Sequence, residues 1–293
     1  MIFLNFFISG ISLGSIYAII ALGYTMVYGI AKMLNFAHGD VIMVGAYVCF
    51  YAVSRYGMNP FVGVVLAMAV CTLLGIVIER FAYKPLRQAP SLAVLITAIG
   101  MSYFLQNTAL LLWSSNPKVF PSIIGRGSFK LFEGKLSVSH VTVLTIATCV
   151  IIMIVLSLFI SKTKLGKAMR ACSEDKGAAQ LMGINVNATI SLTFAIGSGL
   201  AAIAGALLCS AYPTLMPTTG SLPGIKAFTA AVFGGIGSIP GAFLGGLMLG
   251  VIEIFAKAYI SSQLSDAVVF GVLIVVLLVK PSGLLGKQLQ EKV

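Results

Sequence analysis

Few residues of this sequence are suited to acid–base or metal chemistry. Its 293 residues include two histidines and eight aspartates and glutamates. His38 and His140 stand far apart, and no Cys or His pair has the spacing of a metal site. Acid–base catalysis needs two groups whose environments push their pKa values apart within one site, and no such pair is evident. We therefore expect neither an enzyme nor a bound metal or cofactor.

Three polar residues lie close together near the N-terminus. The run Asn35-Phe-Ala-His38-Gly-Asp40 separates the apolar residues 5–30 from 41–54. One interpretation is a turn in which Asn35 or Asp40 caps the start of a helix. The other is a break in a transport pathway, with His38 lining a gate. The sequence leaves both interpretations open.

Polar side chains inside apolar segments need partners, because a charge in the middle of a bilayer costs about 3 kcal/mol or more. Glu253 lies in the apolar segment 226–258, with Lys257 one helical turn further on. We expect these two side chains to pair near the outer interface. Gln106 and Asn107 are expected to bridge helices rather than to bind a substrate.

Charge concentrates in one stretch, residues 161–185, here called the polar segment. It reads SKTKLGKAMRACSEDKGAAQLMGIN between the apolar runs 141–160 and 188–211. Apolar residues of its first half recur at the spacing of one helix face: Leu165, Ala168, Met169 and Cys172. The basic side chains fall off that face. The pattern predicts a short amphipathic helix on a membrane surface.

A second short helix is expected in the polar segment. Ser173 can cap it, with Glu174 and Asp175 in the first turn, where the helix dipole favours anions. Gly183 suits the end of this helix, with Ile184 packing back. The two helices are either an amphipathic loop held by anionic lipid or a coupling element that fits a groove on a cytoplasmic subunit.

Composition identifies the elements that hold these residues. Hydrophobic residues make up 59% of the chain and charged residues 9%, whereas soluble domains are about one quarter charged. The apolar runs lack the alternation of barrel strands, so we expect membrane-spanning helices. They are predicted near 5–30, 41–54, 60–79, 91–113, 141–160, 188–211, 226–258 and 264–280. The expected fold is a single all-α polytopic membrane domain over 1–293 with about eight spans, and no internal repeat is visible.

One of these segments is too long for a single span. Residues 226–258 contain GGIGSIPGA at 234–242, and Pro240 within the glycine cluster argues for an interruption. We expect the segment to enter the membrane, break at the glycines and return as a broken or re-entrant element.

Basic residues near span ends predict the orientation, since short cytoplasmic loops are enriched in Lys and Arg. Arg80, Lys84 and Arg87 follow the third apolar segment, and lysines crowd the polar segment and the C-terminus. We expect the polar segment and the C-terminus in the cytoplasm, the N-terminus outside, and 114–140 as an external loop. The net charge of +11 fits contact with membrane lipid. No basic and aromatic platform indicates nucleic-acid binding.

Six blocks of sequence are spread along nearly the whole chain: Gly14-Ser-Ile-Tyr17-Ala18, Leu34-Asn35-Phe36-Ala37-His38-Gly39-Asp40, Gly166-Lys-Ala-Met-Arg170-Ala171, Ala178-Ala-x-Leu181-x-Gly183-Ile184-Asn185, Gly234-Gly235-Ile-Gly237-Ser-Ile-Pro240 and Lys280-Pro281-Ser-Gly283. In content and order these blocks resemble the permease subunits of bacterial ATP-binding-cassette (ABC) importers for branched-chain amino acids. The chain is similar to the LivH-type permease rather than to the longer LivM type. Lys280 stands where Arg is common in the family, a change that keeps the charge.

The resemblance implies a function and a set of partners. It implies import of leucine, isoleucine and valine across the bacterial inner membrane. The implied partners are a LivM-type permease subunit in a heterodimer, two cytoplasmic ABC ATPase subunits and a periplasmic amino-acid-binding protein. The sequence lacks the phosphate loop G-x-x-x-x-G-K-[ST], so ATP hydrolysis is expected in the partner subunits.

Two other transport functions remain as alternatives. Related permeases serve urea or other small amides, and the sequence does not identify the substrate-contacting residues that would separate these cases. An ion-coupled secondary transporter would need carboxylates within its spans, and Glu253 is nearly alone there.

The resemblance, together with the polar residues described above, indicates two groups of functional residues. Contact with the ATPase is expected from ten residues of the polar segment: Gly166, Lys167, Arg170, Ala171, Glu174, Asp175, Ala178, Leu181, Gly183 and Ile184. The translocation pathway or its gate is expected from eight others: Tyr17, Tyr24, Asn35, His38, Thr97, Gly234, Gly235 and Gly237.

Overall fold

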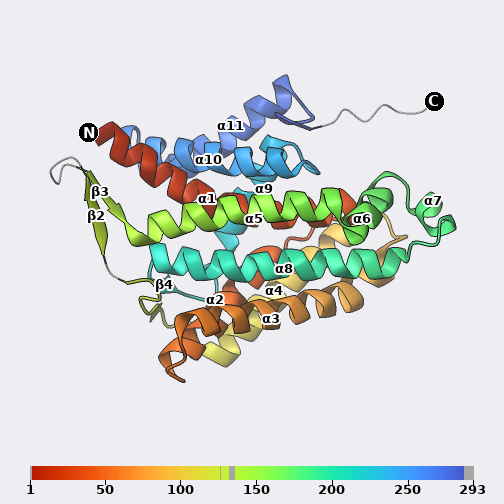
Figure 1. Cartoon of the computed structure of the whole chain (residues 1–293), viewed down its shortest axis with the longest axis horizontal. Coiled ribbons are helices and arrows are strands. Elements are labelled where there is room, and N and C mark those ends of the chain that lie inside the picture. Colours follow the sequence, from red (N-terminus) through yellow and green to blue (C-terminus); the bar gives the residue numbers. More distant parts are fainter. Residues whose placement is uncertain (1, 126, 132–135, 287–293) are drawn as a thin grey trace.

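The computed structural model describes residues 2–125, 127–131 and 136–286, most of which are helical (Figure 1). The helices are α1 (Ile2–Ala31), α2 (His38–Ser54), α3 (Pro60–Ile78), α4 (Ser91–Trp113), α5 (His140–Lys162), α6 (Lys164–Glu174), α7 (Lys176–Leu181), α8 (Val186–Ala211), α9 (Ser221–Gly234), α10 (Ile239–Tyr259) and α11 (Ser265–Val279). Two helical turns follow α3, η1 (Glu79–Tyr83) and η2 (Lys84–Leu86). Two small antiparallel sheets pair β1 (Lys118–Val119) with β4 (Thr214–Leu215) and β2 (Ser128–Leu131) with β3 (Leu136–Ser139).

The expected all-α membrane fold is confirmed, with a different division of the helices. Within the described ranges, six helices are long and apolar enough to cross a membrane: α1, α3, α4, α5, α8 and α10. α2 and α11 are apolar but shorter, and α9 has 14 residues. The expected count of about eight spans is not confirmed: the described residues hold these six long helices and the shorter α2, α9 and α11.

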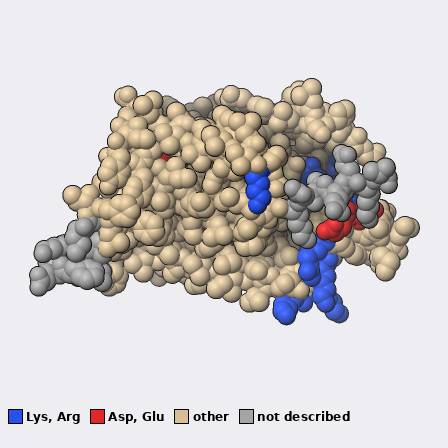
Figure 2. All heavy atoms as spheres, turned by 90° about the horizontal axis from the view of Figure 1, so that it is seen from above, with Lys and Arg blue, Asp and Glu red and all other residues tan. Residues whose placement is uncertain are grey.

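The helices run between two ends of the molecule (Figure 1). α6, α7 and the η1–η2 turns mark one end, here called the α7 end. The β2–β3 hairpin marks the other, the hairpin end. Figure 2 shows most of the charged side chains on its face gathered at the α7 end, while the broad middle is almost uncharged. The predicted cytoplasmic C-terminus, 287–293, and parts of the predicted external loop 114–140 lie outside the described residues.

The structure contains an inverted repeat. α1 packs along α10 as α8 packs along α3, and α2 packs on α3 and α8 as α9 packs on α10 and α1. α1 runs toward the α7 end and α8 runs away from it (Figure 1). The halves α1–α4 and α8–α11 are therefore related by an approximate two-fold axis between α1 and α8. At that axis, a Cβ on either Gly23 or Gly197 would lie 3.3 Å from the other's carbonyl oxygen.

Glycine allows the closest of these contacts. A Cβ on Gly250 of α10 would lie 2.2 Å from the backbone of Gly14 in α1, closer than any real side chain could sit. Small residues let membrane helices approach in this way, so that dispersion forces hold them together where the hydrophobic effect cannot. The central helices α1 and α8 are mostly buried, whereas α3, α4 and α5 lie at the periphery.

The interruption predicted by the glycine-rich sequence separates α9 from α10. Gly235 and Gly237 have φ angles of +106° and +94°, which favour glycine. α9 and α10 then lie side by side, so the predicted break and return are confirmed. α11 runs back toward the α7 end, and just after it Leu284 donates its N–H to the Phe233 carbonyl oxygen at 2.9 Å. The break therefore lies at the α7 end. It is a turn between two helices rather than an opening halfway along them.

Candidate functional site

The first helix of the polar segment, α6, packs its inner face on the long helices. The hydroxyl of Thr163 caps it by accepting the N–H of Gly166 at 3.0 Å. Gly166, Met169 and Cys172 are buried, and a Cβ on Gly166 would lie 2.3 Å from a carbonyl oxygen of α5. Leu165 was expected on this face but is 54% exposed. The buried face is therefore rotated from the predicted apolar one.

The second helix, α7, begins at a different cap from the one predicted. Asp175 accepts the N–H groups of Gly177 and Ala178 on its Oδ1 at 2.7 and 3.0 Å. Ser173 does not cap α7, because its hydroxyl donates to the Arg170 carbonyl oxygen at 2.7 Å within α6. A carboxylate suits this place better, since it also meets the positive end of the helix dipole.

The end of α7 is as predicted. Gly183 has a φ of +82°, and Ile184 donates its N–H back to the Ala179 carbonyl oxygen at 3.0 Å. This six-to-one bond is the Schellman ending that favours glycine. Ile184 is partly buried against the core, so the ending fixes where α7 points.

Most of the predicted contact residues are open to solvent. Seven are exposed: Lys167, Arg170, Glu174, Asp175, Ala178, Leu181 and Gly183. The other three, Gly166, Ala171 and Ile184, face inward and support the helices. Leu181 is 90% exposed, and Met182, which sequence reasoning missed, is 82% exposed. Two large apolar side chains at the charged α7 end form a surface suited to a protein partner.

The polar segment is tied to the end of α1. Lys176 donates from Nζ to the carbonyl oxygen of Ala31, the last residue of α1, at 2.8 Å. This ammonium meets the negative end of the α1 dipole. Burial, followed by the nearby cations Arg87 and Lys32, lowers the pKa of Lys176. The contact joins the polar segment directly to a central helix of the first half.

A second tie joins the η1–η2 turns to α8. Arg87 forms an ion pair with Glu79 and donates to the Asn187 side chain. Glu79 is buried and also accepts the Ser191 hydroxyl at 2.6 Å. The turns after α3 and the start of α8 are therefore held together beside the polar segment.

α2 and α9 both begin inside the helix bundle, and their first turns meet at what we call the central junction. A Cβ on Gly39 would lie 2.7 Å from the Gly220 carbonyl oxygen, and one on Gly220 would lie 1.8 Å from that of Gly39. His38, the first residue of α2, packs against Gly23 of α1. Gly23 lies about 12 Å along the helix axis from Ala31, where α1 ends. Non-helical backbone thus leads into both short helices at this depth.

Gln106 of α4 bridges the central junction. Its Nε2 lies 2.9 Å from Oδ1 of Asp40 in α2 and 3.2 Å from the hydroxyl oxygens of Ser221 in α9 and Ser102 in α4. The prediction that Gln106 bridges helices is confirmed. The same prediction for Asn107 is wrong, because its amide donates to the Tyr103 carbonyl oxygen of its own helix at 2.8 Å.

Of the two interpretations of the run Asn35–Asp40, the helix cap is not what the structure shows at the start of α2. Ala37 occupies the cap position, and no side chain bonds to the first turn there. The Asn35 amide oxygen instead accepts the Tyr83 hydroxyl at 2.9 Å, while Asp40 is bound by Gln106. Both polar groups therefore serve contacts between distant helices.

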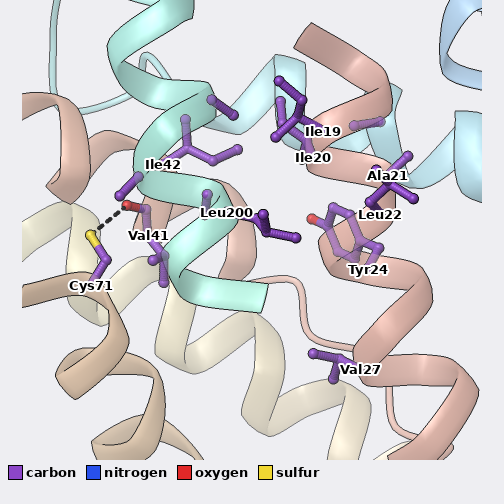
Figure 3. Close-up of a cluster of buried hydrophobic side chains, with 14 of the residues drawn as sticks. Ile19, Ile20, Ala21, Leu22, Tyr24, Val27, Val41, Ile42, Cys71 and Leu200 are labelled. Carbon is purple, nitrogen blue, oxygen red and sulfur yellow. Dashed lines mark hydrogen bonds between the residues drawn. The ribbon is translucent and has the colours of Figure 1, made fainter. Parts of the chain in front are cut away.

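His38 and Tyr24 are the two predicted pathway residues that the fold brings together. Their ring centroids are 4.6 Å apart. His38 is 1% exposed, and its Nε2 has no hydrogen-bond partner among the described residues. Figure 3 shows the apolar surroundings of Tyr24, with Leu200 of α8 between the labelled side chains of α1 and those of α2. Cys71 closes this cluster, its thiol 3.6 Å from the Val41 carbonyl oxygen.

A network of charged and polar side chains joins three helices of the second half, α9, α10 and α11, to α1. Glu253 of α10 binds Lys226 of α9 at 2.8 Å, Lys257 at 2.6 Å and the Tyr17 hydroxyl at 2.8 Å. Lys226 also pairs with Asp266 of α11 at 2.6 Å. The predicted pair Glu253–Lys257 is confirmed, but Glu253 is 1% exposed and has more partners than the sequence indicated. Lys226 was missed because it lies on another helix.

The eight predicted pathway residues do not form one site. Tyr24 and His38 lie beside the central junction. Thr97 lies on α4, half-buried at the periphery. The three glycines of 234–237 belong to the turn between α9 and α10, where a Cβ on Gly235 would lie 2.3 Å from the backbone of Gly286. This geometry divides the predicted set among several parts of the fold.

Comparison with known proteins gives full-length matches. The family model described as branched-chain amino acid transport system / permease component matches residues 6–277. The chain is 47% identical over 302 residues to the high-affinity branched-chain amino acid transport system permease protein BraD of Pseudomonas aeruginosa, covering 99% of this chain and 98% of that protein. The permease protein LivH of Escherichia coli K12 is 45% identical over 309 residues with the same coverage. A probable LivH of Methanocaldococcus jannaschii is 29% identical over 282 residues, covering 92% and 88%.

Proposed function

Because this chain belongs to the family of branched-chain amino acid transport permeases, we propose that it is the membrane-spanning subunit of an ABC importer for leucine, isoleucine and valine. The observation that carries the proposal is sequence identity of 45% or more along the full length of two permeases with that named substrate class. The apolar, helical architecture supports it.

The proposed partners are those that membership of this family implies, and two features of the chain agree with the ATPase subunits among them. The sequence has no phosphate loop, so ATP binding belongs to two cytoplasmic ATPase subunits. A LivM-type subunit completes the permease, and a periplasmic binding protein delivers the amino acid. The exposed apolar pair Leu181 and Met182 at the end of α7 and the exposed Arg170 of α6 support α6–α7 as the surface that meets the ATPase.

Force delivered to the polar segment has a direct route into the helix bundle. α6 packs on α1, α5 and α8, and Lys176 holds the last carbonyl of α1. From Ala31 the chain continues through a few non-helical residues to His38 at the central junction. A rigid displacement of α6–α7 would therefore move the start of α2 with it, which is the kind of coupled shift that interfaces between packed helices allow.

The proposed orientation places the α7 end in the cytoplasm. Basic residues of the short turns lie at that end: Arg80, Lys84, Arg87, Lys162, Lys164, Lys167, Arg170 and Lys176. Positive charge near span ends favours the cytoplasmic side. The start of α1 then lies on the outer side of the bacterial inner membrane.

Uptake in living cells tests the substrate. The complete gene set, expressed in a strain that lacks its own branched-chain importers, should restore uptake of labelled leucine and should not carry labelled urea. Uptake of urea without leucine would replace the substrate assignment. Leucine uptake by this chain alone, driven by a proton or sodium gradient, would overturn the ABC mechanism.

A further inference from the structure

Two basic side chains lie exposed in the turns that follow α3. Arg80 of η1 and Lys84 of η2, here called the turn cations, are both exposed, and Phe81 between them in sequence is 74% exposed. None of the ion pairs among the described residues involves either cation, whereas the neighbouring Arg87 pairs with the buried Glu79. Like charges four residues apart on a helical surface repel each other. The turn cations therefore favour an anion held between them.

The turn cations lie at the end of an apolar stripe on α3. Leu66, Leu73 and Val77 recur at helical spacing and are 41%, 64% and 49% exposed, and Phe81 continues the spacing one turn further. α3 is a peripheral helix with most of its span unburied, so this stripe faces the hydrocarbon of the membrane. The cations follow where the stripe ends, which places their charges at the depth of the lipid headgroups.

The other peripheral helices lack this combination. α4 contains no basic residue, and α5 ends in a single lysine, Lys162. The exposed cations Lys167 and Arg170 belong to α6, which packs a buried face on the long helices and is too short to cross a membrane. Two cations at the end of a lipid-facing stripe are therefore particular to α3 among these helices.

The inward side of the same turn holds two distant parts of the chain. The Tyr83 hydroxyl donates to the Asn35 amide oxygen, just before α2, at 2.9 Å. The Glu79 carboxylate accepts the Ser191 hydroxyl of α8 at 2.6 Å. An anion held by the turn cations would fix the turn from its outer side, and with it these two contacts.

We propose that Arg80 and Lys84 bind the phosphate of an anionic phospholipid in the leaflet at the α7 end, with the acyl chains along the apolar stripe of α3. The headgroup class follows from charge, because the phosphate of a zwitterionic lipid already carries its own cation, whereas that of phosphatidylglycerol does not. A soluble anion would satisfy the cations and leave the stripe unused. A soluble protein could not reach the stripe within the bilayer. The bound lipid is a stabilising ligand, separate from the transported solute.

Native mass spectrometry of the purified importer, titrated with phosphatidylglycerol in detergent, tests this site. The double variant Arg80→Gln/Lys84→Gln removes one arginine and one lysine from exposed positions. The matched control is Lys167→Gln/Arg170→Gln, which removes the same two side-chain types from exposed positions of α6. Arg80→Lys keeps the charge and shows whether charge is what the site requires.

Each basic residue near an anionic headgroup strengthens binding about fivefold, so the double variant at α3 should bind phosphatidylglycerol about thirtyfold more weakly than the parent. The α6 control should stay within about twofold, and Arg80→Lys should bind like the parent. Phosphatidylglycerol, unlike phosphatidylcholine, should raise the melting temperature of the parent by about 2 °C or more, and should leave that of the α3 double variant unchanged.

Three results would overturn the proposal. Equal weakening in the two double variants would mean that the cations act only as part of a diffuse basic surface. Displacement of the lipid by millimolar glycerol 3-phosphate would mean that a phosphate without acyl chains suffices. Cross-linking of Phe81→Cys to a second permease subunit, with no lipid retained, would mean that protein covers the stripe. None of these results bears on leucine as the substrate, which the uptake measurement decides separately.

Discussion

At the scale of single residues, the two lysines that bind Glu253 differ in solvent exposure, which decides how much an ion pair contributes to stability. Both bind the same oxygen, Oε1, at 2.8 and 2.6 Å. The Lys226 side chain is 7% exposed and that of Lys257 is 36% exposed. An exposed pair contributes little, because water screens it. Removing one partner of a buried pair leaves an uncompensated charge.

We therefore predict that Lys226→Met costs about 3–5 kcal/mol of stability, while Lys257→Met costs about 1 kcal/mol or less. The Lys226 change also strips Asp266 of its partner. Thermal unfolding of the two purified variants in the same detergent measures the difference. Equal melting temperatures would show that Lys226 does not stabilise the buried Glu253 carboxylate more than Lys257 does.

Leu181 provides the corresponding test of the polar segment. It is 90% exposed, so nothing within the described chain depends on its side chain for packing. Leu181→Asp should abolish leucine uptake while leaving ATP hydrolysis by the importer within about twofold, and the melting temperature of the isolated chain should not change. Leu181→Met, which keeps an apolar side chain, should retain uptake. Normal uptake by the Asp variant would exclude Leu181 from the coupling surface.

At the scale of elements, features formed by residues close in sequence could be predicted, and features formed by residues far apart in sequence could not. The ends of α7 were predictable in part because a cap and a Schellman ending involve neighbours along the chain. Gly183 was identified correctly, whereas Ser173 and Asp175 are both good capping residues and the sequence could not rank them. The central junction was beyond reach, since Gly39 and Gly220 meet only through the packing of two helices on α1, α8 and α4.

The contact between α1 and α10 yields a prediction that a matched glycine controls. A side chain on Gly250 would begin 2.2 Å from the backbone of Gly14, whereas one on Gly271 in α11 meets nothing within 4 Å. Gly250→Val should force the helices apart and lower the melting temperature, with a cost of about 3 kcal/mol or more. Gly271→Val should leave it unchanged. If both variants melt like the parent, α1 and α10 do not pack at the distance described.

At the scale of the whole molecule, the inverted repeat shows which interruptions of the helices lie inside the bundle. The conspicuous glycines at 234–237 form a turn at the α7 end, while the interior breaks precede α2 and α9, at 32–37 and 212–220. The stretch 32–37 contains neither glycine nor proline, whereas 212–220 contains Pro213, Pro217 and Gly220. The two halves share no sequence pattern that reveals the repeat. Geometry can be repeated without sequence, because inverted packing demands small residues at the crossings and apolar ones elsewhere.

The orientation of the chain in the membrane can be tested at both ends of the helix bundle. α7 and the turn between α2 and α3 lie at opposite ends of the bundle (Figure 1). Asp175 and Tyr56 are both exposed there, Tyr56 by 69%. With basic turns on the cytoplasmic side, Asp175→Cys should react with a membrane-impermeant thiol reagent only in inverted vesicles, and Tyr56→Cys only in intact spheroplasts. The reverse pattern would place α6–α7 outside, where no ATPase could reach it, and the coupling proposal would fail together with the orientation.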